Sequence, residues 1–144
     1  MKQFNIKFRF IPKNQLDSIV FLLQALDPKI DPKVLSQRLD QMKDADYQCV
    51  GIYDSDQLIG ICGLWSLCKY YVGRHLEVDN VFIRPEYRKQ GIGRSLMQWV
   101  ESYAKEQNFC AIELNCYKDN QAGQEFWQNA GYTALGIHYQ KLFE

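Results

Sequence analysis

The chain has 144 residues, of which 47% are apolar and 24% are charged, so it is long enough to form one domain with a hydrophobic core. It carries 17 lysines and arginines against 17 aspartates and glutamates. This balance argues against a general nucleic-acid binder, which normally has a basic excess. No apolar run reaches the length of a membrane span, and the first residues lack the apolar core of a signal peptide. We therefore expect a cytoplasmic protein without membrane or nucleic-acid partners.

The cysteines indicate a reduced protein without a metal site. They are five in number and form no Cys-x-x-Cys pair, and with two histidines in the chain we expect no metal-binding cluster. Four of them fall in segments predicted to be strands, where cysteine usually acts as a small buried apolar residue. The five are Cys49, Cys62, Cys68, Cys110 and Cys116.

The first half of the chain predicts a strand, two helices and three further strands. Apolar residues alternate over 4–10, which is a strand period, and recur at helical spacing over 16–26. The pair Asp31-Pro32 has the residue types of an N-cap and first helical position, so a second helix follows. The next strands are expected at Tyr47–Tyr53, Leu58–Leu67 and Leu76–Ile83, with a hairpin turn at 54–57.

The second half predicts two helices separated by a strand. Ile92, Leu96, Val100 and Ala104 share one helical face, and residues 109–116 are expected to form a buried strand. A last helix, with Ala122, Phe126 and Ala130 on one line, ends at Gly131, and residues 132–143 are expected to be mostly extended.

The order of elements is therefore β-α-α-β-β-β-α-β-α-β over a single domain, residues 1–144. An antiparallel meander that leads into a β-α-β unit predicts an α/β (α+β) fold. We expect a mixed, mostly antiparallel sheet of about six to seven strands with helices on both faces.

The turn between residues 83 and 92 is typical of a phosphate-binding site. Gly91 and Gly93 allow backbone N–H groups to approach a ligand, and the start of a helix favours an anion. The chain has no Walker loop, and a dinucleotide fingerprint fails because Leu96 stands where its last glycine would be. A tight turn without a ligand is the structural alternative.

The stretch from Val81 to Gly93 resembles the acetyl-CoA signature of the GCN5-related N-acetyltransferase (GNAT) family, [RQ]-x-x-G-x-[GA]. A second family block is similar to residues 120–132, although Gly123 stands where alanine is usual. Together with the order of elements, the resemblance covers nearly the whole chain. It implies an acetyl-CoA-dependent N-acetyltransferase that acts on a primary amine by direct attack in a ternary complex. The alternative is a non-catalytic acyl-CoA-binding sensor or regulatory module.

The resemblance also implies which residues hold acetyl-CoA. Backbone groups of the fourth strand would bind the pantetheine arm, the turn and first helical residues would bind the pyrophosphate, and Asn120 would contact the arm or help to close the site. Trp127 would pack against the arm or in the core. The expected cofactor-binding residues are Val81, Phe82, Ile83, Arg88, Lys89, Gln90, Gly91, Ile92, Gly93, Arg94, Ser95, Asn120 and Trp127.

Glu77 and Asp79 are the candidate acid–base residues. A strand period of two puts both on one face, together with Val81 and Ile83. An ammonium must lose a proton before it can attack, and the resemblance favours Glu77 as the base. Asp79 could bind a cationic acceptor instead, and a salt bridge or a hydrogen-bonded edge position is the structural alternative for both. The resemblance implies the backbone N–H of Val81 as donor to the acyl oxygen.

The position that carries the general acid in many members of the family departs from the family pattern in this chain. Many relatives carry a tyrosine seven residues after the asparagine, but this chain has Trp127, whose indole cannot act as an acid at neutral pH. Tyr117 and Tyr139 are possible substitutes. The lone histidines, His75 and His138, are expected to be structural or solvent-facing, and His75 is kept as a substrate-side candidate because it lies near Glu77. We expect a small-molecule or peptide amine as substrate and a monomer or homodimer.

Overall fold

The computed structural model of the protein describes residues 3–143 and divides them into two compact units. The first unit ends at Glu113 and the second begins at Leu114. Each unit is described by itself, and the organisation of the chain as a single domain stays a prediction.

A five-stranded sheet in the order β1-β2-β3-β4-β5 forms the centre of the first unit. β1 to β4 pair with their neighbours in antiparallel fashion, and β5 begins beside β4, where Cys110 N donates to Arg74 O at 2.8 Å. The two-residue turn at Ser55-Asp56, with Ser55 in a left-handed conformation (φ 54°), joins β2 and β3. The strands are β1 (Ile6–Ile11), β2 (Tyr47–Asp54), β3 (Gln57–Lys69), β4 (Gly73–Ile83) and β5 (Ala111–Leu114).

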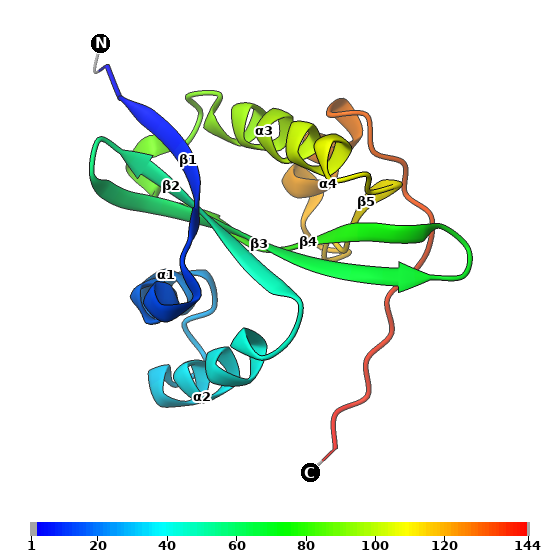
Figure 1. The fold of residues 1–144 in the computed structure, drawn as a ribbon, viewed down its shortest axis with the longest axis horizontal. Helices are drawn as coiled ribbons and strands as arrows, with labels where there is room; N and C mark the ends of the chain where they lie inside the picture. The colour runs from blue at the N-terminus through cyan, green and yellow to red at the C-terminus, as the bar shows by residue number, and fades with distance from the viewer. Residues whose placement is uncertain (1–2, 144) are drawn as a thin grey trace. The chain divides into compact units, whose positions relative to one another are not determined.

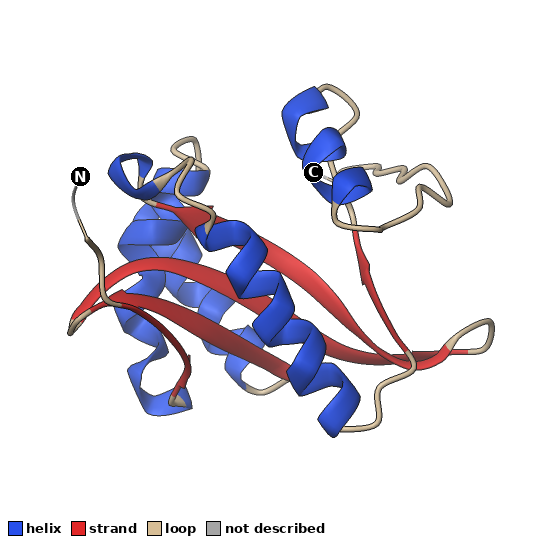
Figure 2. Ribbon diagram, turned by 90° about the horizontal axis from the view of Figure 1, so that it is seen from above, coloured by secondary structure: helices blue, strands red, loops and turns tan. Residues whose placement is uncertain are grey.

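Helices cover both faces of this sheet, as predicted. α1 (Val20–Leu26) and α2 (Pro32–Lys43) lie on one face, and α3 (Ile92–Glu106) crosses the other (Figures 1 and 2). The segment before α1 is a 3-10 helix, Lys13–Ile19, instead of the single long helix that the periodicity predicted. The side chain of Asp31 accepts a bond from Lys33 N at 2.7 Å and caps α2, as its residue type indicated. Among residues 3–143, no helix combines the length and the apolar character that crossing a bilayer needs.

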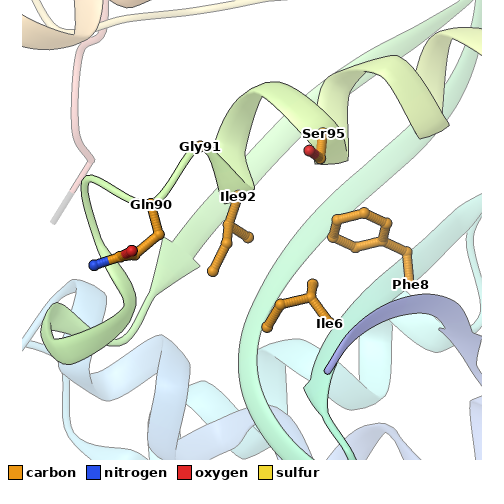
Figure 3. Close-up of a pocket in the computed structure, with 6 residues that line it drawn as sticks. All are labelled: Ile6, Phe8, Gln90, Gly91, Ile92 and Ser95. Atoms are coloured by element: carbon orange, nitrogen blue, oxygen red, sulfur yellow. The ribbon is translucent and has the colours of Figure 1, made fainter. Parts of the chain in front are cut away.

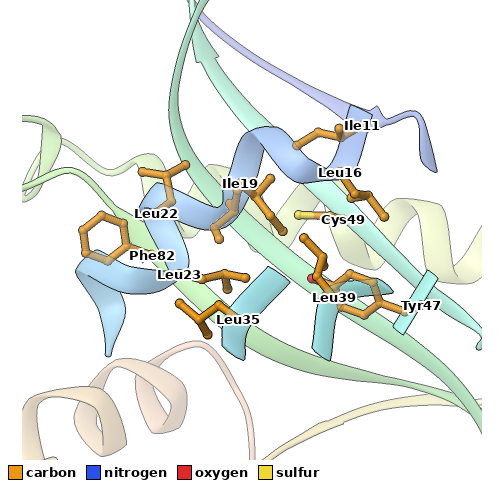
Figure 4. Close-up of a cluster of buried hydrophobic side chains, with 11 residues drawn as sticks. Ile11, Leu16, Ile19, Leu22, Leu23, Leu35, Leu39, Tyr47, Cys49 and Phe82 are labelled. Atoms are coloured by element: carbon orange, nitrogen blue, oxygen red, sulfur yellow. The ribbon is translucent and has the colours of Figure 1, made fainter. Parts of the chain in front are cut away.

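The main core lies between the sheet and the α1–α2 pair (Figure 4). Leu16, Ile19 and Leu39 are at most 1% exposed and pack against Tyr47 and Cys49 of β2. The opposite face packs against α3. There Trp99 and Tyr103 contact Phe10 at ring distances of 5.3 and 4.8 Å, and the predicted inward face of α3 is buried.

β5 is shorter than the predicted segment 109–116. Asn108 has φ 62°, and Phe109 N still donates to Ala104 O, so the chain leaves α3 later than the pattern suggested. Three cysteine assignments also change. Cys49 and Cys62 are buried in strands, but Cys110 precedes β5 and Cys116 follows it, while Cys68 lies in β3 and is exposed.

The second unit consists of α4 (Gln121–Asn129) and its flanking segments. Gly131, with φ 95°, ends the helix as expected. None of the α4 residues is buried. Ala122 and Phe126 lie within the helix, as their spacing predicted, and Ala130 is its C-cap. Residues 132–143 form no strand, and the apolar Leu135 and Ile137 are 81% and 78% exposed. The expectation of six to seven strands was therefore wrong, because an apolar extended segment becomes a strand only with a neighbour to complete its ladder.

Candidate functional site

A β-bulge interrupts β4 in the middle of the predicted site. Gly63 of β3 pairs with Asp79 and Ile61 pairs with Phe82, so Asn80 and Val81 together lie opposite the single residue Cys62. Asn80 has φ 34°, a left-handed conformation that asparagine tolerates better than most residues. Such bulges re-aim side chains and free backbone groups from the regular ladder.

The bulge reverses the two faces of β4. Glu77 and Asp79 do share one face, because their partners Trp65 and Gly63 do, and Phe82 joins that face on the other side of the bulge. Val81 and Ile83 therefore lie on the opposite face. The prediction that they accompany Glu77 and Asp79 was wrong, since the extra residue shifts the strand period by one.

Hydrogen bonds around the bulge hold Asp79 and Asn80 in place. The indole Nε1 of Trp65 donates to Asp79 Oδ2 at 3.0 Å, and Asn80 N donates to Asp79 Oδ1 at 2.8 Å. The hydroxyl of Tyr47 donates to Asn80 Oδ1 at 3.1 Å, and burial raises the pKa of Tyr47, so that it remains a donor. A Cβ at Gly63 would overlap Asn80 Oδ1 and lie 2.7 Å from Tyr47 Oη, so this cluster requires glycine there.

The Glu77 carboxylate differs from that of Asp79. Both Asp79 oxygens accept bonds that shape the bulge, whereas no hydrogen bond to the Glu77 side chain occurs within residues 3–143. Glu77 is half-buried across from Trp65. The hydrogen bond from Tyr71 to Glu113 raises the pKa of Tyr71, and the charge of Glu77 adds a smaller contribution in the same direction. Glu77 is therefore the carboxylate on this face that remains available to a ligand.

The turn from β4 to α3 presents backbone N–H groups. Lys89 and Gly91 adopt left-handed conformations, with φ 61° and 79°. The first bond of the helix runs from Ser95 N to Gly91 O, so the N–H groups of Ile92, Gly93 and Arg94 precede it and lack helical acceptors. A Cβ at Gly91 would meet nothing within 4 Å, so the space beside the turn is open. The turn therefore fits an anionic group such as a pyrophosphate.

The basic side chains of the turn divide into fixed and solvent-directed groups. Arg88 Nε donates to Ile83 O at 2.8 Å, and its guanidinium lies 5.2 Å from the centre of the Phe82 ring. Lys89 and Arg94 are exposed and can turn toward a phosphate. The base of the turn is fixed by Tyr87, whose hydroxyl donates to Asp54 at 2.8 Å and whose pKa this bond raises.

A shallow hollow of about 210 Å³ adjoins the turn between β1 and the start of α3 (Figure 3). Its floor is apolar, formed by Ile6, Phe8 and Ile92, while Gln90 and Ser95 lie at its rim. The hollow offers apolar contact beside the turn, whereas the backbone N–H groups supply the anion site.

The remaining predicted residues belong to the second unit. Asn120 Oδ1 accepts a bond from Gly123 N at 3.0 Å and so caps α4. A Cβ at Gly123 would lie 2.5 Å from Asn120 Nδ2, which connects this glycine to the capping conformation of Asn120. Trp127 is half-buried and contacts Tyr132 edge to face at 5.2 Å, and Tyr117 is 86% exposed. Their roles toward a ligand stay predictions.

Comparison with known proteins identifies the family. The model of the acetyltransferase (GNAT) family matches residues 16–132. The chain belongs to this family. The match includes the bulged strand, the β4–α3 turn and α4, so the expected cofactor-binding residues, Glu77, Asp79 and Tyr117 lie within the GNAT region, and Tyr139 lies outside it.

Two curated relatives share part of the GNAT region. A Bacillus subtilis (strain 168) protein, provisionally assigned as a ribosomal protein bS18-alanine N-acetyltransferase, is 29% identical over 80 residues, which cover 56% of this chain and 50% of that protein. A Xenopus tropicalis protein, provisionally assigned as N-acetyltransferase 14, is 29% identical over 87 residues, 60% of this chain and 41% of that protein. The chain thus spans about half the length of the curated relatives it matches.

Solved GNAT structures share the fold. A ribosomal-protein-alanine N-acetyltransferase from Brucella melitensis biovar Abortus 2308 superposes with a TM-score of 0.80 at 18% identity, covering 96% of this chain and 99% of that one. The aminoglycoside enzyme AAC(6')-Iy, in complex with the bisubstrate analog CoA-S-monomethyl-acetylneamine, gives 0.80 at 17% identity with the same coverage. GNAT membership therefore rests on the family match, and these structures show the fold.

Sequence reasoning missed several residues that the structure places in or near the bulged strand. Tyr47, Gly63 and Asn80 build the bulge, and the one signal for it was an asparagine within an otherwise apolar strand segment. Glu113 of β5 was overlooked because an isolated glutamate in a short strand carries no pattern. Burial raises the pKa of Cys49 to about 12, and that of Cys62 as well, so neither thiol is a nucleophile near neutral pH. In the described part of the chain, no cluster of three or more His, Cys, Asp or Glu side chains could hold a metal ion.

Proposed function

We propose that this protein transfers an acetyl group from acetyl-CoA to a primary amine. The observation that carries the proposal is Glu77, a half-buried carboxylate without a hydrogen-bond partner in residues 3–143, on the strand that leads into the anion-binding turn. GNAT membership supports this chemistry, as do the N-acetyltransferase names of the relatives.

Residues of the first unit suit the binding of acetyl-CoA. The N–H groups of Ile92, Gly93 and Arg94 would receive the pyrophosphate, with Lys89 and Arg94 supplying positive charge. The solved GNAT structure with a CoA-derived bisubstrate analog supports this assignment. In the second unit, Asn120 caps α4 through Oδ1, which leaves Nδ2 to donate to the pantetheine arm.

The acid–base chemistry would rest on Glu77. When bound, acetyl-CoA supplies the thioester carbonyl carbon and a thiolate leaving group. Glu77 takes one proton from the ammonium of the acceptor, so that the amine nitrogen can form its bond to carbon as the C–S bond breaks. The nitrogen releases a second proton to water as the amide forms, while the departing thiolate takes up one. Asp79 orients this face of the strand through Trp65 and Asn80, and its negative charge attracts a cationic acceptor.

Backbone and tyrosine groups would complete the reaction. The bulge takes Val81 out of the regular register of β4, and in this proposal its N–H donates to the acyl oxygen as negative charge develops there. Tyr117 is the proposed source of a proton for the departing thiolate, and its high exposure leaves it accessible to a ligand.

The first experiment measures transfer of acetyl groups to three amines: spermidine, the aminoglycoside sisomicin and a peptide with an N-terminal alanine. The name of the Bacillus subtilis relative motivates the peptide, and a solved aminoglycoside acetyltransferase in complex with sisomicin, which shares the fold, motivates the aminoglycoside. Acetylated products are detected by mass spectrometry, because the exposed Cys68 and Cys110 would react with thiol reagents that detect free CoA. We expect product with at least one amine, and a loss of roughly 10²- to 10⁴-fold in kcat/KM for Glu77→Gln.

The matched control is Glu86→Gln, which removes an exposed carboxylate from the turn region and should leave kcat/KM within twofold. Acetyl-CoA at about 100 times its Kd should stabilise both variants by roughly 2.7 kcal/mol, which shows that they fold and bind. Binding of acetyl-CoA without any product, together with no effect of Glu77→Gln, would instead support the acyl-CoA sensor.

A further inference from the structure

A line of α3 residues that faces β1 changes from large to small side chains toward the start of the helix. Tyr103 and Trp99 are four residues apart, so they share one face of α3, and their rings lie 4.8 and 5.3 Å from that of Phe10 on β1. Four positions earlier on the same line is Ser95, and Gly91 precedes it by another four. The aromatic cover of β1 therefore ends before the first turn of α3.

The small residues leave the hollow of about 210 Å³ open above the first half of β1 (Figure 3). Ile6 and Phe8 form its floor and are half-buried, and the ring of Phe8 lies 6.3 Å from that of Trp99. Sites that enclose a whole drug-sized ligand measure about 300–1,000 Å³, so this hollow fits a single ring system that forms part of a larger ligand. Phe8 offers an aromatic surface on which a flat ring can stack.

The hollow is continuous with the anion-binding turn. Gly91 and Ile92 line the hollow and also belong to the turn, and the N–H of Ile92 lacks a helical acceptor. Lys89 and Arg94, which flank these two residues in the sequence, are exposed and supply positive charge. A phosphate bound at the turn therefore lies beside an apolar surface for a ring. A nucleotide combines these two groups, because one sugar joins its base to its phosphates.

The polar side chains of the hollow suit the edge of a purine. The Gln90 amide carries a donor and an acceptor, which match the N7 acceptor and N6 donor of adenine, and the Ser95 hydroxyl can donate to a ring nitrogen. Among the residues that the structure describes, no charged side chain lines the hollow. A neutral base therefore fits the hollow better than a second phosphate does.

We propose that this hollow between β1 and α3 holds the adenine ring of the acetyl donor, with the ring stacked on Phe8 and its edge at Gln90 and Ser95. The inference rests on the proposed function for the identity of the donor, acetyl-CoA. The protein then recognises the nucleotide half of its donor, so it uses free acetyl-CoA and discriminates against an acyl group on the phosphopantetheine arm of a carrier protein, which has no base. ADP, which has the base and the phosphates, competes with acetyl-CoA for the hollow and the turn.

The position of the base is tested by NMR without turnover. In the complex with CoA, the H2 or H8 proton of adenine should give nuclear Overhauser effects to the ring of Phe8 and to the methyl groups of Ile6 and Ile92. A CoA complex without these effects would overturn the proposal, even if acetyl transfer is observed.

The contribution of the base is tested by calorimetry with CoA, ADP and 4′-phosphopantetheine, which lacks the adenosine. Ser95→Trp continues the aromatic line of α3 from an exposed position and fills the hollow. It should weaken the binding of CoA and of ADP about tenfold, the loss expected when a base no longer stacks on an aromatic ring, while the Kd of 4′-phosphopantetheine stays within twofold. Phe8→Leu keeps an apolar floor without the ring and should weaken CoA about threefold with the same selectivity.

Ser102→Trp is the matched control, because it adds the same ring to the same helix at an exposed position away from the turn, and it should change none of the three Kd values. If Ser95→Trp lowers the thermal midpoint by more than Ser102→Trp does, Phe8→Leu and the Overhauser effects decide the outcome.

Equal weakening of CoA and 4′-phosphopantetheine, or an unchanged Kd for CoA, would overturn the proposal. Acetylated product without adenine contacts in the hollow would overturn it as well and leave the proposed function intact. The expected contacts and Kd pattern without product from any amine would instead overturn the proposed function and leave the adenine site in place.

Discussion

The two units of this protein differ in the sequence separation of the residues that their side-chain hydrogen bonds join. In the first, side chains from distant positions meet, as when Tyr47 of β2 donates to Asn80 of β4 and Tyr71 donates to Glu113. In the second, bonds are local: Asn120 caps its own helix, and α4 contains no buried residue. A bond between neighbours in the sequence can cap a helix, but it does not determine what packs against that helix. Bonds between residues far apart in the sequence bring the side chains of a site together. The difference teaches that the proposed role of Glu77 draws on residues that the fold brings together, while the proposed roles of Tyr117, Asn120 and Trp127 need a ligand to test them.

Thiol labelling should give the largest contrast, between the buried core of the first unit and its exposed parts. Burial raises the pKa of Cys49 to about 12, so at pH 8 its thiolate population is about 10³-fold below that of an ordinary thiol with a pKa near 8.5. Exposed Cys68 and Cys110 should react with maleimide within seconds, and Cys49 and Cys62 only on unfolding, as mass spectrometry can follow. Because the raised pKa keeps the folded thiol protonated, stability should fall as pH rises above about 9. Rapid labelling of Cys49 in the folded protein would mean that the core opens readily.

Leucine truncation should show the next largest contrast. Leu39 is fully buried, and Leu39→Ala should lower the free energy of unfolding by about 2–5 kcal/mol because it leaves a cavity. Leu135 is 81% exposed, and Leu135→Ala should change the same quantity by less than about 0.5 kcal/mol. Urea unfolding measures both. A large cost at Leu135 would show that the second unit packs in solution against a surface that covers this side chain.

Glycine replacement tests the bulge directly. Gly63→Ala should cost about 1–3 kcal/mol, since its Cβ would displace the Asn80 side chain and crowd Tyr47. Gly136→Ala, where a Cβ meets nothing within 4 Å, should be neutral or slightly stabilising. The midpoints of urea unfolding measure the stability of both variants. The kcat/KM of Gly63→Ala should also fall, because the bulge positions Glu77 and Val81. Full activity of this variant would separate the bulge from catalysis.

Helix caps should give the smallest effects. Asp31→Ala removes the cap of α2, which packs in the core, and should lower global stability by about 1 kcal/mol. Asn120→Ala removes the cap of α4 and should leave the unfolding of residues 3–113 unchanged while amide exchange in α4 becomes faster. If both variants lower the global midpoint equally, the two units unfold together.

The sequence predicted the helices and the first five strands because each has its own period, cap or turn residues. The inward face of α3, the Asp31 cap and the hairpin turn depend on nearby residues alone. The bulge at Asn80 could not be predicted in this way, since it arises from how β4 pairs with β3. The same holds for the side chains of His75 and Glu113, which the order of strands brings within 3.6 Å of each other. Residues 132–143 are apolar enough for a strand, but the composition of a segment does not show whether a neighbouring strand is there to pair with it. Location in the cell and the assembly state stay predictions.

Because of the one-residue bulge at Asn80, the number of residues in β4 determines which side chains lie on each face of the sheet. Deleting any residue between Asp79 and Phe82 would restore a regular period and turn one half of the strand over. Either Phe82 would leave the core, or Glu77 and Asp79 would move to the face packed against α3. We therefore expect this strand to tolerate the exchange of exposed side chains more easily than the addition or loss of a residue, because a change in the number of residues would alter the face that Glu77 occupies.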